Sequence, residues 1–199
     1  LNTAAIQKAI DACHAAGGGR VWCGPGRHLT GTITLKSRVD LHLAAGCVLL
    51  GSPSLADYRD FAGEGLDMSN PSEKSCKSLI QAAGAEDLAI TGPGEVNGNG
   101  LVFFDTAAWT PDKKVFGKPG TERPRLLMCH RCRRVRIEDA RFVDSPLWSL
   151  WLMRCEQVHI HRIRIEGDHR MNNQDGIDFD SCRDVTVSDS RFKTGDDCL

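Results

Sequence analysis

Apolar and polar residues alternate over short stretches of this chain, and the alternation returns at intervals. The unit is an apolar residue, one intervening residue and a second apolar residue. It occurs at Val39 and Leu41, Leu88 and Ile90, Val135 and Ile137, Val158 and Ile160, and Val185 and Val187. Alternation with a period of two is typical of a β-strand with one buried face. The pattern therefore predicts a series of short strands.

The last three copies of the unit share the same flanking residues. A cysteine precedes each one by three residues, and a large apolar residue follows seven residues after its first position. The cysteines are Cys132, Cys155 and Cys182, and the apolar residues are Phe142, Ile165 and Phe192. These copies are 23 and 27 residues apart, whereas the earlier separations of 49 and 47 residues are expected to cover two repeats plus loops.

A strand-based repeat with a period in the low twenties predicts a solenoid. Leucine-rich repeats have a similar period, but their leucine and asparagine framework is missing here. β-Branched and aromatic residues favour an all-β fold, the right-handed parallel β-helix, in which equivalent residues of successive coils stack about 4.8 Å apart. The three cysteines are therefore expected to form a ladder inside the coil.

We interpret residues 1–199 as the N-terminal portion of a single parallel β-helix domain that continues beyond Leu199. Residues 1–19 are expected to form a capping helix over the open end of the coil, with a partner-binding helix as the alternative. Asn2 or Thr3 is expected to cap this helix. Its predicted apolar face consists of Ala5, Ile6, Ala9, Ile10 and Cys13. Residues 20–199 form the coils, with loops inserted at 51–77 and 99–124.

Composition narrows the functional classes. Of the 199 residues, 41% are hydrophobic and 26% are charged, which is ordinary for a globular chain. A net charge of −1 gives no support for binding nucleic acid or a membrane surface. Nine cysteines cannot all pair within this chain, and Cys129 and Cys132 have no second pair at zinc-site spacing. Buried thiols are the simplest interpretation.

Aspartates mark equivalent positions of the last two coils. Counting back seven residues from Cys182 gives Asp175, and the same count from Cys155 gives Trp148. Asp197 follows Asp175 by 22 residues, about one coil. Asp175 and Asp197 are therefore expected to lie on neighbouring coils at matching levels. Strand alternation is expected to send the side chain of the adjacent Asp196 another way.

Carboxylates this close raise at least one of their pKa values by mutual repulsion. A carboxylic acid that gives a proton near neutral pH, beside carboxylates that hold a water, is the equipment for hydrolysing a glycosidic bond. Two other interpretations remain at this point. Aspartates that cap turns are common, and clustered carboxylate oxygens also suit calcium.

Two motifs resemble the signature of the polygalacturonases, glycoside hydrolase family 28. They are "NQDGID" at residues 173–178 and "GDDC" at residues 195–198. The stretches "TAAIQKAIDAC", "PGRHLTG" and "ITGPGEVNGNG" are similar to the opening coils of that family. The resemblance covers essentially the whole chain. It implies a β-helical enzyme that acts on a pectic polysaccharide or oligogalacturonide without a cofactor or metal.

The resemblance also implies roles for single residues. Asp196 matches the general acid that protonates the leaving glycosidic oxygen, and Asp175 with Asp197 matches the pair that activates the attacking water. Asn173 matches the asparagine that shapes the subsite. Asp178 is expected in a supporting role, facing away from Asp175. Family members invert the anomeric centre, and acid and base carboxyls are then expected about 6.5–9.5 Å apart.

The chain departs from the family pattern in two ways. Gln174 stands where the family usually has threonine. The downstream Gly-His-Gly and Arg-x-Lys motifs, which bind the uronate carboxylate, have no counterpart before Leu199.

Two tryptophans and an arginine are further candidates for substrate binding. Trp148 takes the position of Asp175 one coil earlier, and a sugar ring stacking on it is weighed against core packing. Alternation places Trp151 on the opposite face, so at most one of the two is expected in the cleft. Arg170 precedes the Asp175 turn and is a candidate contact for an anionic sugar. His159 and His161 are expected on the exterior.

The sequence thus predicts an inverting hydrolase for α-linked galacturonate, secreted or periplasmic although no signal peptide is present. The two insertions favour exo action or a rhamnogalacturonan-type substrate. A non-catalytic β-helix that binds carbohydrate is the alternative of another class. A β-helical pectate lyase is a further alternative, and it needs calcium and an arginine base.

Overall fold

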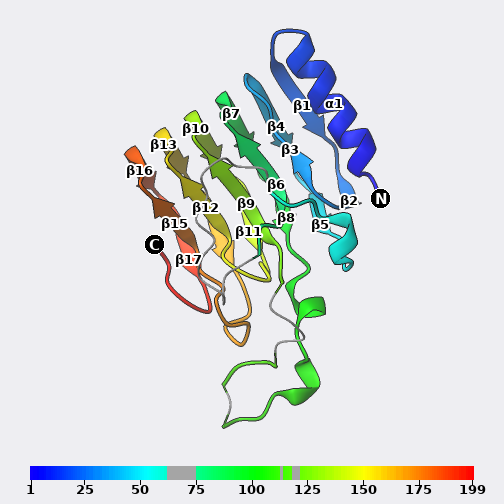
Figure 1. The fold of residues 1–199 in the computed structure, drawn as a ribbon, viewed down its shortest axis with the longest axis vertical. Coiled ribbons are helices and arrows are strands. Elements are labelled where there is room, and N and C mark those ends of the chain that lie inside the picture. The colour runs from blue at the N-terminus through cyan, green and yellow to red at the C-terminus, as the bar shows by residue number, and fades with distance from the viewer. Residues whose placement is uncertain (62–74, 113, 118–121) are drawn as a thin grey trace.

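The chain of this computed structural model winds into a coil whose strands return to the same three sides once per turn (Figure 1). The structure describes residues 1–61, 75–112, 114–117 and 122–199. Strands of successive turns pair in parallel in all three sheets. Crossovers between parallel strands are right-handed, and the predicted right-handed parallel β-helix is confirmed.

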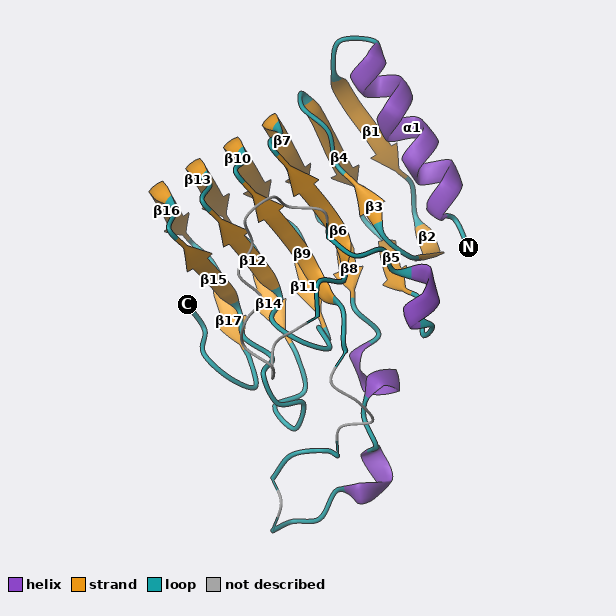
Figure 2. Ribbon diagram, viewed as in Figure 1, coloured by secondary structure: helices purple, strands orange, loops and turns teal. Residues whose placement is uncertain are grey.

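The three sheets run side by side along the coil (Figure 2). Sheet A contains β1 (Gly19–Cys23), β4 (Val39–Leu43), β7 (Glu86–Thr91), β10 (Arg133–Glu138), β13 (Glu156–His161) and β16 (Arg183–Ser188). Sheet B contains β2 (Gly26–Thr30), β5 (Cys47–Gly51), β8 (Glu95–Asn97), β11 (Arg141–Val143), β14 (Arg164–Glu166) and β17 (Arg191–Lys193). Sheet C contains β3 (Ile33–Thr34), β6 (Ser78–Ala83), β9 (Arg125–His130), β12 (Leu150–Met153) and β15 (Ile177–Asp180).

The repeated apolar unit forms the inner face of sheet A. Val135 pairs with Leu88 on one side and with Val158 on the other. The expectation that the two earlier separations hold two repeats each was wrong, however. β4 pairs directly with β7, and β7 pairs directly with β10, so each separation is a single coil lengthened by an insertion. Register is kept because backbone hydrogen bonds join the coils irrespective of the chain length between them.

Cysteines stack inside the coil, as the repeat predicts. Cys132 and Cys155 are buried and Cys182 is half-buried. The Cys155 thiol donates to the carbonyl of Cys129, and the Cys182 thiol donates to that of Leu152. Hydrogen bonding to the Cys132 thiol, together with burial, raises the pKa of Cys155 to about 12. Cys132, Cys155 and Cys182 form no disulfide, so this ladder fills the core without crosslinking it.

Helix α1 (Thr3–Ala15) lies across the first coil and packs against β1, β3 and β4. Its buried side chains are Ile6 and Ile10, with Cys13 partly buried beside them. The predicted apolar face was too wide, because Ala5 and Ala9 are exposed. No helix among the described residues combines the length and apolar character that crossing a bilayer requires.

The ends of α1 are held by tertiary contacts. Asn2 is the N-cap residue, but its side chain makes no capping hydrogen bond. Thr3 does not cap the helix either, because its hydroxyl accepts the backbone N–H of Gly31 at 2.8 Å and so ties α1 to the end of β2. At the other end, Gly18 has a φ of +116°, and a Cβ there would overlap the backbone of Arg38. Only glycine meets both conditions.

Two long connections leave the coil. The described part of the first, between β5 and β6, contains the short 3-10 helix η1 (Leu55–Asp57). The second, between β8 and β9, contains η2 (Gly100–Phe103) and η3 (Thr106–Ala108). Of the loops expected at 51–77 and 99–124, residues 62–74, 113 and 118–121 lie outside the described residues.

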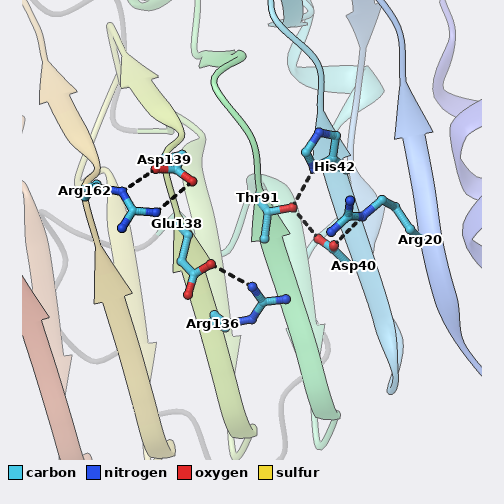
Figure 3. A network of polar contacts seen from close by, with 8 residues as sticks. All are labelled: Arg20, Asp40, His42, Thr91, Arg136, Glu138, Asp139 and Arg162. Atoms are coloured by element: carbon cyan, nitrogen blue, oxygen red, sulfur yellow. Dashed lines mark hydrogen bonds and ion pairs between the residues drawn. The ribbon is translucent and has the colours of Figure 1, made fainter.

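Polar side chains cover the outer face of sheet A and link its strands (Figure 3). The Thr91 hydroxyl donates to Asp40 at 2.7 Å, and Arg20 pairs with the same carboxylate at 2.8 Å. His159 is exposed and His161 half-buried on this face, which agrees with their expected exterior positions. Exposed ion pairs of this kind stabilise a protein by at most about 1 kcal/mol each. The stability of the fold therefore comes mainly from the buried ladders.

Truncating one ladder residue should be costly. Phe142 is fully buried between Val96 and Ile165 in sheet B. We expect Phe142→Ala to lower the free energy of unfolding by about 3–5 kcal/mol, because the rigid coil leaves a cavity. Thr186→Ala, at an exposed position of β16, should change it by less than about 0.5 kcal/mol. Urea unfolding followed by circular dichroism measures both; equal effects would contradict the ladder model.

Candidate active site

Asp175 lies in the turn that leads into β15, and backbone hydrogen bonds set its level in the coil. Ser149 N–H donates to the carbonyl of Asp175 at 2.9 Å, and Gly176 N–H donates to the carbonyl of Asp197 at 2.8 Å. Continuing this register places Trp148, Asp175 and Asp197 at one level on three successive coils. The predicted coil registry is confirmed.

The carboxylates of Asp175, Asp196 and Asp197 converge. One oxygen from each lies within 4.8 Å of the others. The expectation that Asp196 points elsewhere was wrong, because β17 ends at Lys193 and strand alternation does not extend to this turn. The facing oxygens are also closer than the separation expected between the acid and base carboxyls of an inverting enzyme.

Glycines bring the two turns together. Gly195 N–H donates to the carbonyl of Gln174 at 3.2 Å, and a Cβ on Gly195 would overlap the carbonyl oxygen of Met171. A Cβ on Gly176 would likewise overlap the carbonyl oxygen of Cys198. Absence of a side chain at both positions is what lets the Asp175 turn and the Asp196–Asp197 turn approach each other.

Asp175 is the buried member of the trio. The residue is only 8% exposed, and its Oδ1 has no hydrogen-bond partner among the described residues. Burial, and then the negative charges of Asp178, Asp196 and Asp197, raise the pKa of Asp175 to about 7. The sequence predicts at least one raised pKa in this cluster, and Asp175 has one. Asp196 and Asp197 are exposed.

Asp178 acts on the same site. It was expected to face away from Asp175, but its charge is the largest electrostatic contribution to the raised pKa of Asp175. Alternation fails here because β15 begins only at Ile177, so Asp175 belongs to the preceding turn. Asp178 pairs in register with Trp151 of β12, which places the carboxylate beside the tryptophans.

Both tryptophans border one hollow of about 400 Å³ next to the carboxylates. Its lining consists of Trp148, Trp151, Ile177, Asp178, Phe179, Asp180, Asp197 and Leu199. The two indole rings contact edge to face, with centroids 5.3 Å apart. The prediction that at most one tryptophan faces the cleft was wrong, since Trp148 precedes β12 and is not subject to its alternation.

Sequence reasoning missed two buried arginines. Arg123 is 1% exposed and Arg125 fully buried at the start of β9. The Arg125 guanidinium lies over both tryptophans, 4.8 Å from the Trp148 ring and 4.6 Å from the Trp151 ring, and also donates to the carbonyl of Ser75. The signal was present, because the seven-residue count that finds Asp175 and Trp148 gives Arg125 when started from Cys132.

Of the two remaining candidates, Asn173 lies in the turn that carries Asp175, whereas Arg170 makes other contacts. Asn173 adopts a left-handed backbone with φ +54°, and its Oδ1 accepts a hydrogen bond from Arg123 at 3.4 Å, so it lies in the turn that carries Asp175. Arg170 does not line the hollow with the carboxylates. Its Nε donates to Asp168 at 2.8 Å, and its guanidinium lies 4.7 Å from the ring centre of Phe116. That engagement does not favour the predicted contact with an anionic sugar.

The cluster can do two kinds of chemistry. Three carboxylate oxygens within 4.8 Å are donors that suit a hard cation such as calcium. The same crowding suits a cluster that keeps one proton up to neutral pH and delivers it to a leaving group. A carboxyl that is buried and raised in pKa, beside two exposed carboxylates, matches the second kind more closely.

The chain is thus a parallel β-helix that carries three converging carboxylates in the turns of its last two coils. A family model described as glycosyl hydrolases family 28 matches residues 52–199, and the chain belongs to that family. It is 28% identical to a probable polygalacturonase of Vitis vinifera over 100% of this chain and 40% of that protein. It is 26% identical to an endo-polygalacturonase of Pectobacterium carotovorum subsp. carotovorum, over 98% and 50%.

Solved structures show the same similarity. A family 28 exopolygalacturonase of Yersinia enterocolitica superposes with a TM-score of 0.81 at 26% identity, covering 100% of this chain and 41% of that one. A hyperthermoactive exopolygalacturonase of Thermotoga maritima gives a TM-score of 0.77 at 26% identity, covering 97% and 49%. The chain thus spans about 40–50% of the length of these relatives.

The raised pKa of Asp175 predicts a pH-dependent cost. A carboxyl whose pKa is higher in the folded than in the unfolded state destabilises the fold when ionised, so the penalty appears as pH rises from about 4 to about 7. We expect Asp175→Asn to raise the free energy of unfolding on the order of 2 kcal/mol more at pH 8 than at pH 4. Urea unfolding at both values measures this. An equal gain at both would contradict the raised pKa.

Proposed function

We propose that this chain carries the hydrolytic centre of a pectin-degrading glycosidase that cleaves α-galacturonosidic linkages. The observation that carries the proposal is the convergence of three carboxylates, one of them buried and raised in pKa to about 7. Membership of glycosyl hydrolases family 28 and the polygalacturonase names of its relatives support the substrate.

Each carboxylate takes one step in the proposed reaction. Asp196 donates its proton to the glycosidic oxygen as the bond from that oxygen to the anomeric carbon breaks. Asp175 and Asp197 hold a water whose oxygen attacks the anomeric carbon, and they accept its proton. The water oxygen replaces the leaving oxygen from the opposite side in a single displacement, so the product is inverted. The facing oxygens are closer than the separation expected for an inverting enzyme. Identifying the anomer of the product therefore decides between inversion and retention.

Side chains around the trio hold the sugar in this proposal. Trp148 and Trp151 present apolar surface for stacking against a sugar ring, and Asn173 and Asp178 offer polar atoms beside the reacting bond. No cofactor or metal takes part in these steps. Relatives include both endo- and exo-acting enzymes, so their names favour neither mode of cleavage.

We also propose a secreted or periplasmic location, because pectin lies outside the cell that degrades it. A polymeric substrate must be cut before its products are taken up.

Removing the general acid should abolish most hydrolysis. We expect Asp196→Asn, in the protein that contains this chain, to lower kcat on polygalacturonate about 10²–10⁴-fold. Asp184→Asn is the matched control, because Asp184 is an exposed aspartate of β16 with a positive φ that asparagine also adopts. Release of reducing ends measures both variants.

The same assay separates the rival activities. Hydrolysis should persist in EDTA and give no unsaturated uronide, whereas a calcium-dependent lyase would lose activity and would give that product. Binding of polygalacturonate without release of reducing ends, equal in the parent protein and in Asp196→Asn, would instead indicate a carbohydrate-binding role without catalysis.

Activity should fall on the alkaline side of neutral pH. The site keeps one proton below the pKa of Asp175, about 7, and the reaction proceeds from the arrangement in which that proton is on Asp196 and Asp175 is ionised as the base, so the acid is lost above that pH. We expect kcat/KM to decline about tenfold per pH unit above that value. A pH–rate profile on oligogalacturonides measures the limb. A profile that stays flat to pH 9 would contradict the assignment of the shared proton.

A further inference from the structure

Arg123 joins the two turns that precede the last two strands of sheet C. Its Nη1 donates to the carbonyl of Pro146 at 2.7 Å and to the carbonyl of Asn172 at 3.0 Å, while its Nη2 reaches Asn173 Oδ1 at 3.4 Å. Pro146 leads into β12, and Asn172 and Asn173 lead into β15 through Asp175. One guanidinium thus connects three successive coils at the level of Asn173, two residues before the level of Asp175.

The site of Arg123 is enclosed. The residue is 1% exposed, and its guanidinium lies 5.1 Å from the centre of the Phe104 ring, which comes from the insertion between β8 and β9. Burial lowers the pKa of Arg123 to about 10, and the negative charge of Asp175 acts against that lowering. A buried cation is expensive without a nearby anion, and Asp175 supplies that anion to Arg123 when its carboxyl is ionised.

Asn173 explains why the turn needs such a clamp. Its left-handed backbone is an uncommon conformation for a residue other than glycine, although asparagine tolerates it better than most. The carbonyl of Asn172 and the amide of Asn173 are both fixed by the guanidinium of Arg123. A planar fork with several donors holds two acceptors in a fixed geometry, which a lysine ammonium does not reproduce.

We infer that Arg123 is a positioning residue for the reaction, which fixes the turn that carries Asp175 and supplies the buried positive charge that balances the carboxylate cluster. This inference rests on the proposed function for its effect on rate. Its effect on Asp175 is a property of the folded protein alone.

Substitutions of Arg123 separate the effect of its positive charge from the effect of its hydrogen-bond geometry. Arg123→Lys keeps the positive charge but loses the fork, whereas Arg123→Met loses both. Arg125→Lys is the matched control, since Arg125 is equally buried but lies over the tryptophans. The negative charges of Asp178 of β15 and of the turn residues Asp196 and Asp197 act on Asp175, and the charge of Asp175 acts on Arg123.

The experiment uses the protein that contains this chain and has two readouts. Carboxyl ¹³C NMR follows the titration of Asp175, and steady-state kinetics on an oligogalacturonide gives kcat and KM. In Arg123→Met the Asp175 midpoint should rise by about one pH unit, because a cation that favours its ionised form is gone. In Arg123→Lys the midpoint should stay near that of the parent protein, while kcat falls about 10²-fold with little change in KM, because Asp175 is misplaced. Arg125→Lys should leave the Asp175 midpoint unchanged.

Each outcome either supports or overturns one half of the inference, electrostatic or positional. An Asp175 midpoint in Arg123→Met equal to that of the parent protein would overturn the electrostatic half of the inference. Parent-like kcat in Arg123→Lys would overturn the positional half, as would a loss of rate that merely tracks the unfolded fraction seen in thermal melts. Where Arg123→Met does not fold, Arg123→Lys alone decides. A parent protein that hydrolyses no uronide would refute the proposed function, while the NMR titrations would still test the inference.

Discussion

Everything in this molecule depends on the hydrogen-bonded ladder that keeps successive coils in register. The ladder stacks Val135 on Leu88 and Val158 in the interior, and by the same bonds it brings Asp175 level with Asp197 on the surface. The same hydrogen-bond register therefore fixes both the core and the carboxylate cluster. A slip of one residue in a parallel ladder would turn core side chains outward and would also separate the carboxylates.

Crowding of the aspartates opposes folding. The positive charge of the buried Arg123 offsets part of this cost. Asp175, Asp196 and Asp197 converge within 4.8 Å, the charge of Asp178 also acts on Asp175, and Asp175 is held neutral up to about pH 7. Two arginines with almost no exposed surface lie nearby: Arg123 contacts the turn that carries Asp175, and Arg125 lies against the tryptophans. Electrostatic strain at a site and its compensation in the layer below are a common arrangement in proteins whose function needs a perturbed group.

Periodicity made the fold and part of the site predictable from the sequence, and the predictions failed where the periodicity ends. The β-helix, the thiol ladder and the shared level of Asp175 and Asp197 all came from counting residues within the repeat. Errors arose at the turns: Trp148, Asp175 and Asp196 each lie outside a strand, so alternation wrongly predicted the facing of Trp151, Asp178 and Asp196. The contacts of Arg123 depend on a carbonyl 49 residues away in the chain, and no local pattern carries that information. The two widely spaced early units failed for a related reason, since spacing alone does not separate two short coils from one long one.

The two long connections have a consequence for how such a chain can vary. β6 pairs in register with β3 and β9, and β8 pairs in register with β5, although long segments intervene between β5 and β6 and between β8 and β9. Closing a longer loop adds only a slowly growing entropic penalty, so residues can be added or removed there while the rungs stay in place. These two connections can therefore differ in length between related chains while the carboxylate cluster keeps its register.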